Sequence, residues 1–174
     1  PGMHNQNPSC FKDSTEMRLR KRLTQAYVAV LLHLSAWLAR RERLNQITQS
    51  FMHFLAGIVI RRKNISPQTT LSELGQAWQQ AFPSVKHHPI TKIDDTTVYG
   101  EIHTNCPLRG TGDVHACHRM MEFDRTIARQ AGGEFVVLRS QSEPGVTVCQ
   151  IAMRLRGSDT SDLQPAHQPT HARS

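Results

Sequence analysis

Three cysteines in the second half of the chain carry the side chains best suited to chemistry. Cys106 lies in an Asn-Cys-Pro segment, Cys117 follows after ten intervening residues, and Cys149 follows after 31 more. Thiolates are nucleophiles and ligands of metal ions, so these residues could form a redox pair, a metal site or an iron–sulfur site. The absence of any Cys-x-x-Cys pair from the sequence argues against a closed zinc site of the finger or ribbon type.

The position of Cys117 predicts an activated thiol. Asp113 is expected to cap a helix that holds Cys117 at the end of its first turn. Unpaired amides and the helix dipole at that end lower the pKa of a thiol, so Cys117 is the predicted thiolate. His115 and His118 would add positive charge beside it if they point toward it.

Cys149 is more ambiguous, because the strand that carries it predicts a buried structural thiol on the same face as Ile151 and Met153. Three thiolates gathered by folding could nevertheless hold a metal ion or an iron–sulfur cluster. A redox-sensing thiol pair and cysteines that only pack stay open as alternatives. The candidate metal ligands are Cys106, Cys117, Cys149, His103, His115 and His118, with Asp113 or Cys10 as further candidates.

A nucleophilic enzyme is not favoured by these residues. A Cys-His hydrolase would need a histidine base beside Cys117 and a third group to orient it, and no diagnostic local pattern is present. The glycines of 109–112 lack the spacing and the lysine of a phosphate-binding loop. The sequence therefore favours a function other than catalysis without deciding the question, and we assign no catalytic residues.

The elements that must position the cysteines follow from hydrophobic periodicity. Apolar residues at helical spacing predict helices over 14–38, 44–58, 72–82 and 113–131, and the stretch 85–96 is expected to be a loop. Alternating residues predict strands over 97–103, 134–139 and 146–155, the last two joined as a hairpin. Helices first and then strand, helix, strand, strand is typical of an α+β fold, with a small antiparallel sheet covered on one face.

Length and composition predict one domain with polar ends. The chain has 174 residues, of which 38% are hydrophobic and 20% charged. We expect an N-terminal arm over 1–13, whose first two residues look like a tag remnant, a single domain over 14–156 and a disordered tail over 157–174. Four irregularly spaced cysteines do not suit a secreted disulfide scaffold, so a cytoplasmic location is expected.

Two apolar runs could suggest a membrane helix. The segments 27–38 and 51–60 are each shorter than the roughly 18 apolar residues that a span needs, and each contains a histidine. They are better explained as core or dimer helices, so we expect a homodimer and no membrane partner.

The basic charge of the chain is concentrated in its first third. Residues 1–63 hold eleven Lys or Arg against three acidic residues, whereas the whole chain has a net charge of +7. Such clusters could contact phosphates, and the contacts would be strongly salt dependent. The candidate nucleic-acid-binding residues are Arg18, Arg20, Lys21, Arg22, Arg61, Arg62 and Lys63.

The order of features over 98–155 is similar to a known sensor family. A strand, an Asn-Cys-Pro loop, a cysteine at a helix start and a closing hairpin with a cysteine on its last strand resemble the small-molecule-binding domain named after 4-vinyl reductase. They also resemble the cysteine-bearing C-terminal part of iron–sulfur repressors that control cluster assembly. The resemblance covers about a third of the chain, and its site residues would be Cys106, Cys117 and Cys149.

Two functional hypotheses follow. The resemblance implies a regulatory sensor that binds a small ligand, a metal ion or an iron–sulfur cluster and passes its state to a regulatory protein or to DNA, as in transcription regulation. The alternative is a basic helical module that binds nucleic acid or a protein partner, in which the cysteines only pack.

Overall fold

The computed structural model describes the backbone of residues 9–168 and the side chains of 22–24 and 26–168. The chain divides into two compact units, 1–34 and 35–174. The first unit contains most of helix α1 (Ser9–Ala39), and the second contains all the other elements. The predicted single domain over 14–156 is therefore divided within α1.

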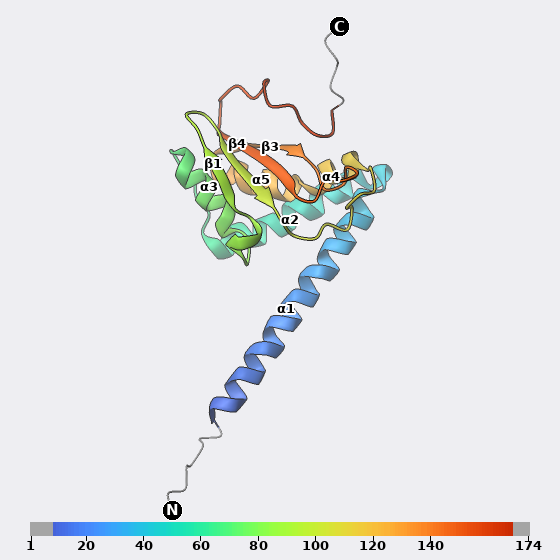
Figure 1. The fold of residues 1–174 in the computed structure, drawn as a ribbon, viewed down its shortest axis with the longest axis vertical. Helices are drawn as coiled ribbons and strands as arrows, with labels where there is room; N and C mark the ends of the chain where they lie inside the picture. The colour runs from blue at the N-terminus through green and yellow to red at the C-terminus, as the bar shows by residue number, and fades with distance from the viewer. Residues whose placement is uncertain (1–8, 169–174) are drawn as a thin grey trace, which may run out of the picture. The chain divides into compact units, whose positions relative to one another are not determined.

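The second unit is built from helices and one antiparallel sheet, as Figure 1 shows, so the predicted α+β class is confirmed. The four strands have the spatial order β1-β2-β4-β3. The helices are α2 (Asn45–Lys63), α3 (Leu71–Gln80), α4 (Val114–Met120) and α5 (Glu122–Gln130), with short 3-10 turns at Glu42–Leu44 and Val85–His87. The strands are β1 (Ile90–Ile93), β2 (Val98–Ile102), β3 (Gly133–Arg139) and β4 (Cys149–Leu155).

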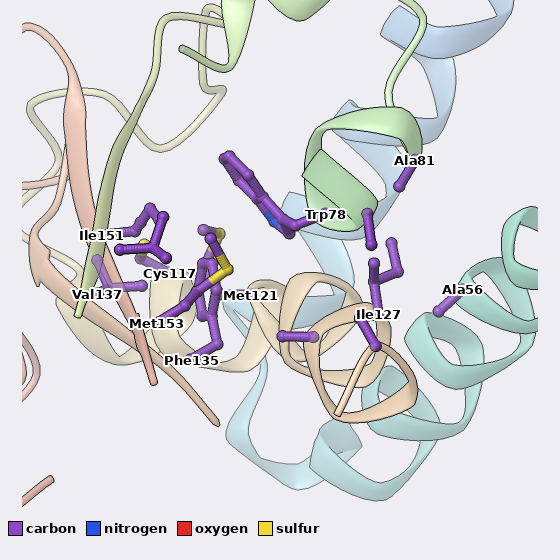
Figure 2. Packing of buried hydrophobic residues seen from close by; sticks show 14 of the residues in the cluster. Ala56, Trp78, Ala81, Cys117, Met121, Ile127, Phe135, Val137, Ile151 and Met153 are labelled. Carbon is purple, nitrogen blue, oxygen red and sulfur yellow. The ribbon is translucent and has the colours of Figure 1, made fainter. Parts of the chain in front are cut away.

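One face of the sheet carries the apolar side chains that the helices cover. In β4 the alternate residues Cys149, Ile151 and Met153 are buried, and their partners Ile102, Gly100 and Val98 in β2 lie opposite them. Helix α3 contacts β2 and β4, helix α5 contacts β3, and α2 packs on the outer side of α4 and α5. The core therefore lies between the sheet and the helices, with Trp78 of α3 fully buried in it (Figure 2).

Two predicted elements differ from the structure. The helix predicted over 113–131 is instead two helices, α4 and α5, that meet at Met121. At this break the Arg125 guanidinium donates a hydrogen bond to the backbone carbonyl oxygen of His118, an acceptor that a continuous helix would use for its own backbone. The loop predicted over 85–96 contains β1. This strand is mostly exposed and is bulged between Ile90 and Lys92, so it lacks a regular pattern of apolar residues.

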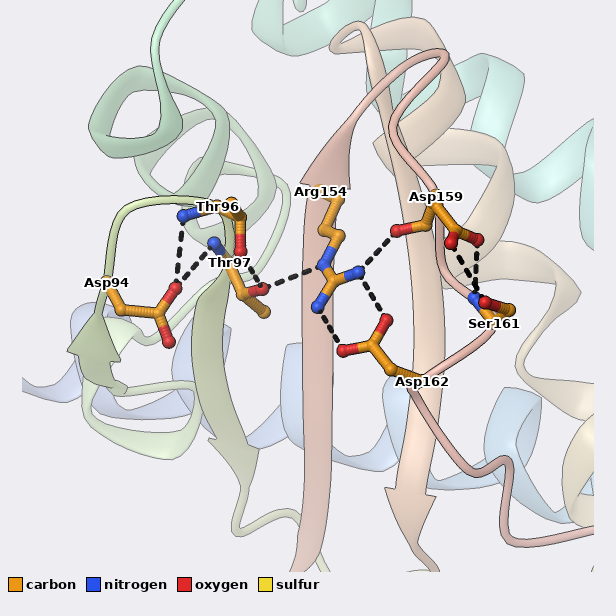
Figure 3. A network of polar contacts seen from close by, with 7 residues as sticks. All are labelled: Asp94, Thr96, Thr97, Arg154, Asp159, Ser161 and Asp162. Atoms are coloured by element: carbon orange, nitrogen blue, oxygen red, sulfur yellow. Dashed lines mark hydrogen bonds and ion pairs between the residues drawn. The ribbon is translucent and has the colours of Figure 1, made fainter.

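The prediction of a disordered tail from Gly157 onward is wrong for residues 157–168. Asp162 forms a bidentate ion pair with Arg154 at 2.6 and 2.7 Å, and the Arg154 side chain also donates to Thr97 Oγ1 at 2.8 Å (Figure 3). Leu163 is buried, and the Ala166 N–H donates to the Val137 carbonyl at 2.8 Å, along the open edge of β3. The polar composition of the tail gives no sign that it is ordered, because the residue that holds it, buried Arg154, lies outside the tail. Residues 169–174 lie outside the described range.

None of the helices in residues 9–168 is long and apolar enough to cross a membrane.

We expect Asp162→Ala to release the tail, because the substitution removes both acceptors of the Arg154 ion pair. Hydrogen exchange measured by mass spectrometry should rise across 157–168, with only a small loss of global stability, since Asp162 is itself exposed. Asp95→Ala, at an exposed position in the β1–β2 turn, is the matched control. Unchanged protection in the Asp162 variant would show that the ion pair does not hold the tail.

Candidate thiol site

Folding brings the three cysteines of the second half of the chain into one neighbourhood. Cys117 comes from α4, Cys149 begins β4, and Cys106 lies in the loop between β2 and α4. The Cys117 and Cys149 side chains are hydrogen bonded, and Cys106 is close enough to act electrostatically on both. All three are free thiols; Cys117 and Cys149 are buried and Cys106 is half-buried.

Local sequence explains why α4 presents Cys117 to the sheet. Asp113 caps the helix, as predicted, with its Oδ1 accepting from the Ala116 N–H at 2.8 Å. The cap fixes where the helix begins, and therefore which residues face inward: Ala116 and Cys117 are buried, whereas His115 is exposed. Figure 2 shows Cys117 in the core cluster that also contains Val137 and Ile151.

The structure reverses the predicted roles of the two buried thiols. Cys117 donates its S–H to Cys149, which raises the Cys117 pKa, and burial raises it further. A hydrogen bond from Ser140 acts in the opposite direction but is outweighed. The Cys149 pKa is lowered by the same Cys117 hydrogen bond, although burial opposes the change, and the Gln141 N–H adds to it by donating to Cys149 Sγ at 3.3 Å. Of the two sulfurs, Cys149 is therefore the more readily ionised.

The prediction for Cys117 was wrong because it considered only the helix end. Asp113 already engages one of the amides there, and α4 has only seven residues. A direct hydrogen bond between neighbouring thiols fixes which sulfur keeps the proton, and it acts at a shorter range than a helix dipole.

Cys106 is held as the more accessible third thiol. Its Sγ accepts the Leu108 N–H at 3.4 Å, which favours the thiolate, but burial dominates and raises the Cys106 pKa. Arg109 lies nearby and lowers it slightly. Cys106 is therefore a protonated thiol at the partly exposed side of the site.

The fully buried Gln141 connects the cysteine-bearing segments. Its side-chain oxygen accepts from the Cys106 N–H at 3.3 Å and from the Arg109 guanidinium at 2.8 and 3.1 Å. Its side-chain nitrogen donates to the carbonyl groups of Ile102 at 2.9 Å and Thr104 at 3.0 Å. The same residue therefore fixes the Cys106 loop through its side chain and Cys149 through its backbone.

A buried carboxyl group completes the electrostatic environment of the pair. Asp124 of α5 is 6% exposed and accepts the Trp78 indole N–H at 3.1 Å. Burial raises its pKa to about 6, although the Trp78 hydrogen bond works against the rise. In its ionised form Asp124 raises the pKa values of both Cys117 and Cys149. Protonation of Asp124 would therefore favour the Cys149 thiolate.

Comparisons with protein-family profiles, with curated proteins and with solved structures find no match to this chain.

The histidines predicted as metal ligands contact groups other than the thiols. His103 pairs with Glu101 at 2.7 Å on the surface, and the nearest ring to His118 is that of His167, 3.6 Å away between centroids. Burial lowers the His118 pKa to about 4, helped by the Arg125 guanidinium. Among the described side chains, those of 22–24 and 26–168, no group of three or more His, Cys, Asp or Glu is arranged to hold a metal ion.

The predicted nucleic-acid-binding residues are only partly placed. Arg61, Arg62 and Lys63 are exposed in the last turn of α2, and Arg22 is exposed in α1. The side chains of Arg18, Arg20, Lys21 and Cys10 lie outside the described residues.

Three residues of the site were not predicted as such. Ser140 and Gln141 follow β3 directly and looked like an ordinary polar turn, yet both are buried. Asp124 is the third of these residues. Its place in the first turn of α5, on the same face as Ile127 and Ala128, was the one available signal that it points inward.

We expect Asp124→Asn to stabilise the protein at pH 7 by about 1 to 3 kcal/mol, because it keeps an acceptor for Trp78 and removes a buried charge. The folded-state pKa of Asp124, about 6, exceeds the ordinary value of 3.8, so the folded wild type binds the proton more tightly. Wild-type stability should therefore fall as pH rises from about 4 to 6, and the variant should lose that dependence. Urea unfolding between pH 4 and 8 measures both.

Exposed Asp95→Asn serves as the control for this substitution, and it should follow the wild-type pH profile. The Asp124 variant should also titrate Cys149 at a lower pH, since one negative charge is removed from its neighbourhood. A destabilised Asp124→Asn protein with the wild-type pH profile would contradict the buried, readily protonated carboxyl.

Proposed function

We propose that this protein is a regulatory sensor domain whose responsive element is the thiol cluster of Cys106, Cys117 and Cys149. The observation that supports this most directly is the pairing of the buried Cys117 and Cys149 side chains, each of which shifts the pKa of the other. It places two sulfurs next to each other and gives one of them the lower pKa that reactivity requires. Two cysteines that only fill space in the core would not need such an arrangement.

The proposed chemical step is reversible disulfide formation. A peroxide oxidises the Cys149 thiolate to a sulfenic acid, and one oxygen of the peroxide leaves as water or alcohol. The Cys117 sulfur then displaces the sulfenic oxygen as water, its own proton being consumed, and the Cys117–Cys149 disulfide forms. Cellular dithiols reverse the step by exchange. Half-buried Cys106 lies on the more accessible side of the pair.

The loop from 103 to 113 is the element that would report the change. It is attached to the pair at both ends, through Gln141 near Cys106 and through Asp113 at the start of α4. Drawing Cys117 toward Cys149 moves α4, and with it the surface of the loop. A regulatory protein or DNA that reads this surface would respond to the oxidation state.

The proposal also covers ligand binding at the same site. The three sulfurs would bind a soft metal ion, an iron–sulfur cluster or a small ligand, since thiolates suit all three. We further propose that the domain acts in the cytoplasm, where thiols are kept reduced, and as a homodimer. Metal analysis and visible absorption of protein purified without oxygen test the metal branch. Stoichiometric metal that is lost in each of the three Cys→Ser variants would support it.

The disulfide is tested in the 174-residue chain with Cys10 replaced by serine. On treatment with hydrogen peroxide we expect intact mass to fall by two hydrogen atoms and peptide mapping to show a Cys117–Cys149 link. Cys149→Ser should slow the first oxidation more than Cys117→Ser does, because Cys149 is the more readily ionised of the two thiols. Hydrogen exchange across 103–113 should change on oxidation and return on reduction.

Cys106→Ser is the matched control, and it should still form the Cys117–Cys149 link. The proposal is wrong if the reduced, folded protein oxidises only at Cys106, or if the link forms with no change in the exchange of the loop.

A nucleic-acid-binding function stays as the alternative, favoured by the exposed run of Arg61, Arg62 and Lys63 at the end of α2. Its affinity for duplex DNA should fall steeply with salt, because each phosphate contact releases counterions. Replacing the three residues by alanine should weaken binding and reduce the salt slope, as measured by fluorescence anisotropy. Binding that is unaffected by these changes would exclude this surface.

A further inference from the structure

Helix α1 carries apolar side chains at coiled-coil spacing. Leu23, Tyr27, Val30, Leu34 and Trp37 follow one another at intervals of four, three, four and three residues, and we call them the α1 stripe. This 3.5-residue repeat places all five along one side of a helix. Each is 42% to 65% exposed. Apolar rows with this repeat are ordinarily buried against a partner helix.

The helix around the stripe is unusual in two further respects. From Leu23 to Ala39 the sequence contains no Asp, Glu, Lys or Arg, and the charged group that contacts the stripe is the Arg41 guanidinium, which lies over the Trp37 ring at its end. The helix has 31 residues, and helices of soluble proteins owe most of their stability to packing of an apolar face. A solvated helix would need polar side chains where α1 has alanine, valine and leucine.

We propose that the α1 stripe is a dimer surface, and that its occupant is the α1 stripe of a second copy of this chain. The heptad spacing favours this partner, because two helices with the same repeat interlock along their whole length. Half-exposed side chains of this size offer roughly 100 Å² each. The five together supply most of the roughly 600 to 800 Å² per partner of a small stable interface.

The distribution of charge distinguishes this partner from an anionic one. Basic residues bound the charge-free segment on both sides, with Arg22 before it and Arg40, Arg41 and Arg43 after it. In a dimer these clusters approach each other and repel, so salt should strengthen association by screening them. Binding to an anionic bilayer or to nucleic acid would weaken with salt instead. The sign of the salt effect is therefore diagnostic.

This inference gives a location to the homodimer of the proposed function and is independent of the thiol chemistry. The test is sedimentation equilibrium of the full-length reduced chain, at low and high salt, for wild type, Val30→Asp and Ala29→Asp. The two substitutions introduce the same charge at adjacent exposed positions, of which only Val30 belongs to the α1 stripe. We expect a wild-type dimer that tightens with salt, a dimer for Ala29→Asp, and at least a tenfold weaker association for Val30→Asp.

Three outcomes would overturn the inference. The first is a monomeric wild type at both salt concentrations. The second is a dimer that survives Val30→Asp but is lost on substitution of Phe54→Asp, at an exposed apolar position of α2, because the interface would then lie on α2. The third is a monomer that binds phosphatidylserine vesicles through Val30. A monomeric Val30→Asp protein that still forms the Cys117–Cys149 disulfide separates this inference from the proposed function.

Discussion

A polar side chain with no access to water must find its hydrogen-bond partners within the protein, and Gln141 meets this constraint at the centre of the thiol site. Each end of its amide is satisfied by groups from the segment between β2 and α4 or from the end of β2 itself. Its backbone carbonyl accepts the Gly110 N–H at 2.8 Å. An alternative placement of the loop would leave several of these groups unpaired, each at a cost of about 1 to 3 kcal/mol.

These hydrogen bonds allow the pKa values of the two buried thiols to differ without a cation beside the pair. Cys149 receives hydrogen bonds from the Cys117 thiol and from the Gln141 backbone, whereas Cys117 gives its proton away to the same sulfur. In a dry environment short-range hydrogen bonds have more influence on proton position than distant charges. The negative charge of ionised Asp124 opposes ionisation of Cys149, and the raised pKa of this carboxyl limits that opposition.

Patterns that depend on neighbouring residues in sequence were predicted well. The Asp113 cap, the inward face of Cys149 and the β3–β4 hairpin all follow from spacing over a few positions. Interactions between distant segments could not be predicted in the same way. The Cys117–Cys149 bond joins a helix to a strand, and the polar tail is ordered because Arg154 lies under it. Nothing in either local sequence identifies the other partner.

Strand β4 has neighbours on both sides, β2 and β3, and so two ladders of backbone hydrogen bonds. It carries Cys149 at one end and Arg154 near the other, on opposite faces of the sheet. A strand bonded in this way resists a slip in register, because any slip breaks both ladders at once. Strain from the proposed disulfide would therefore fall on the seven-residue helix α4 rather than on β4.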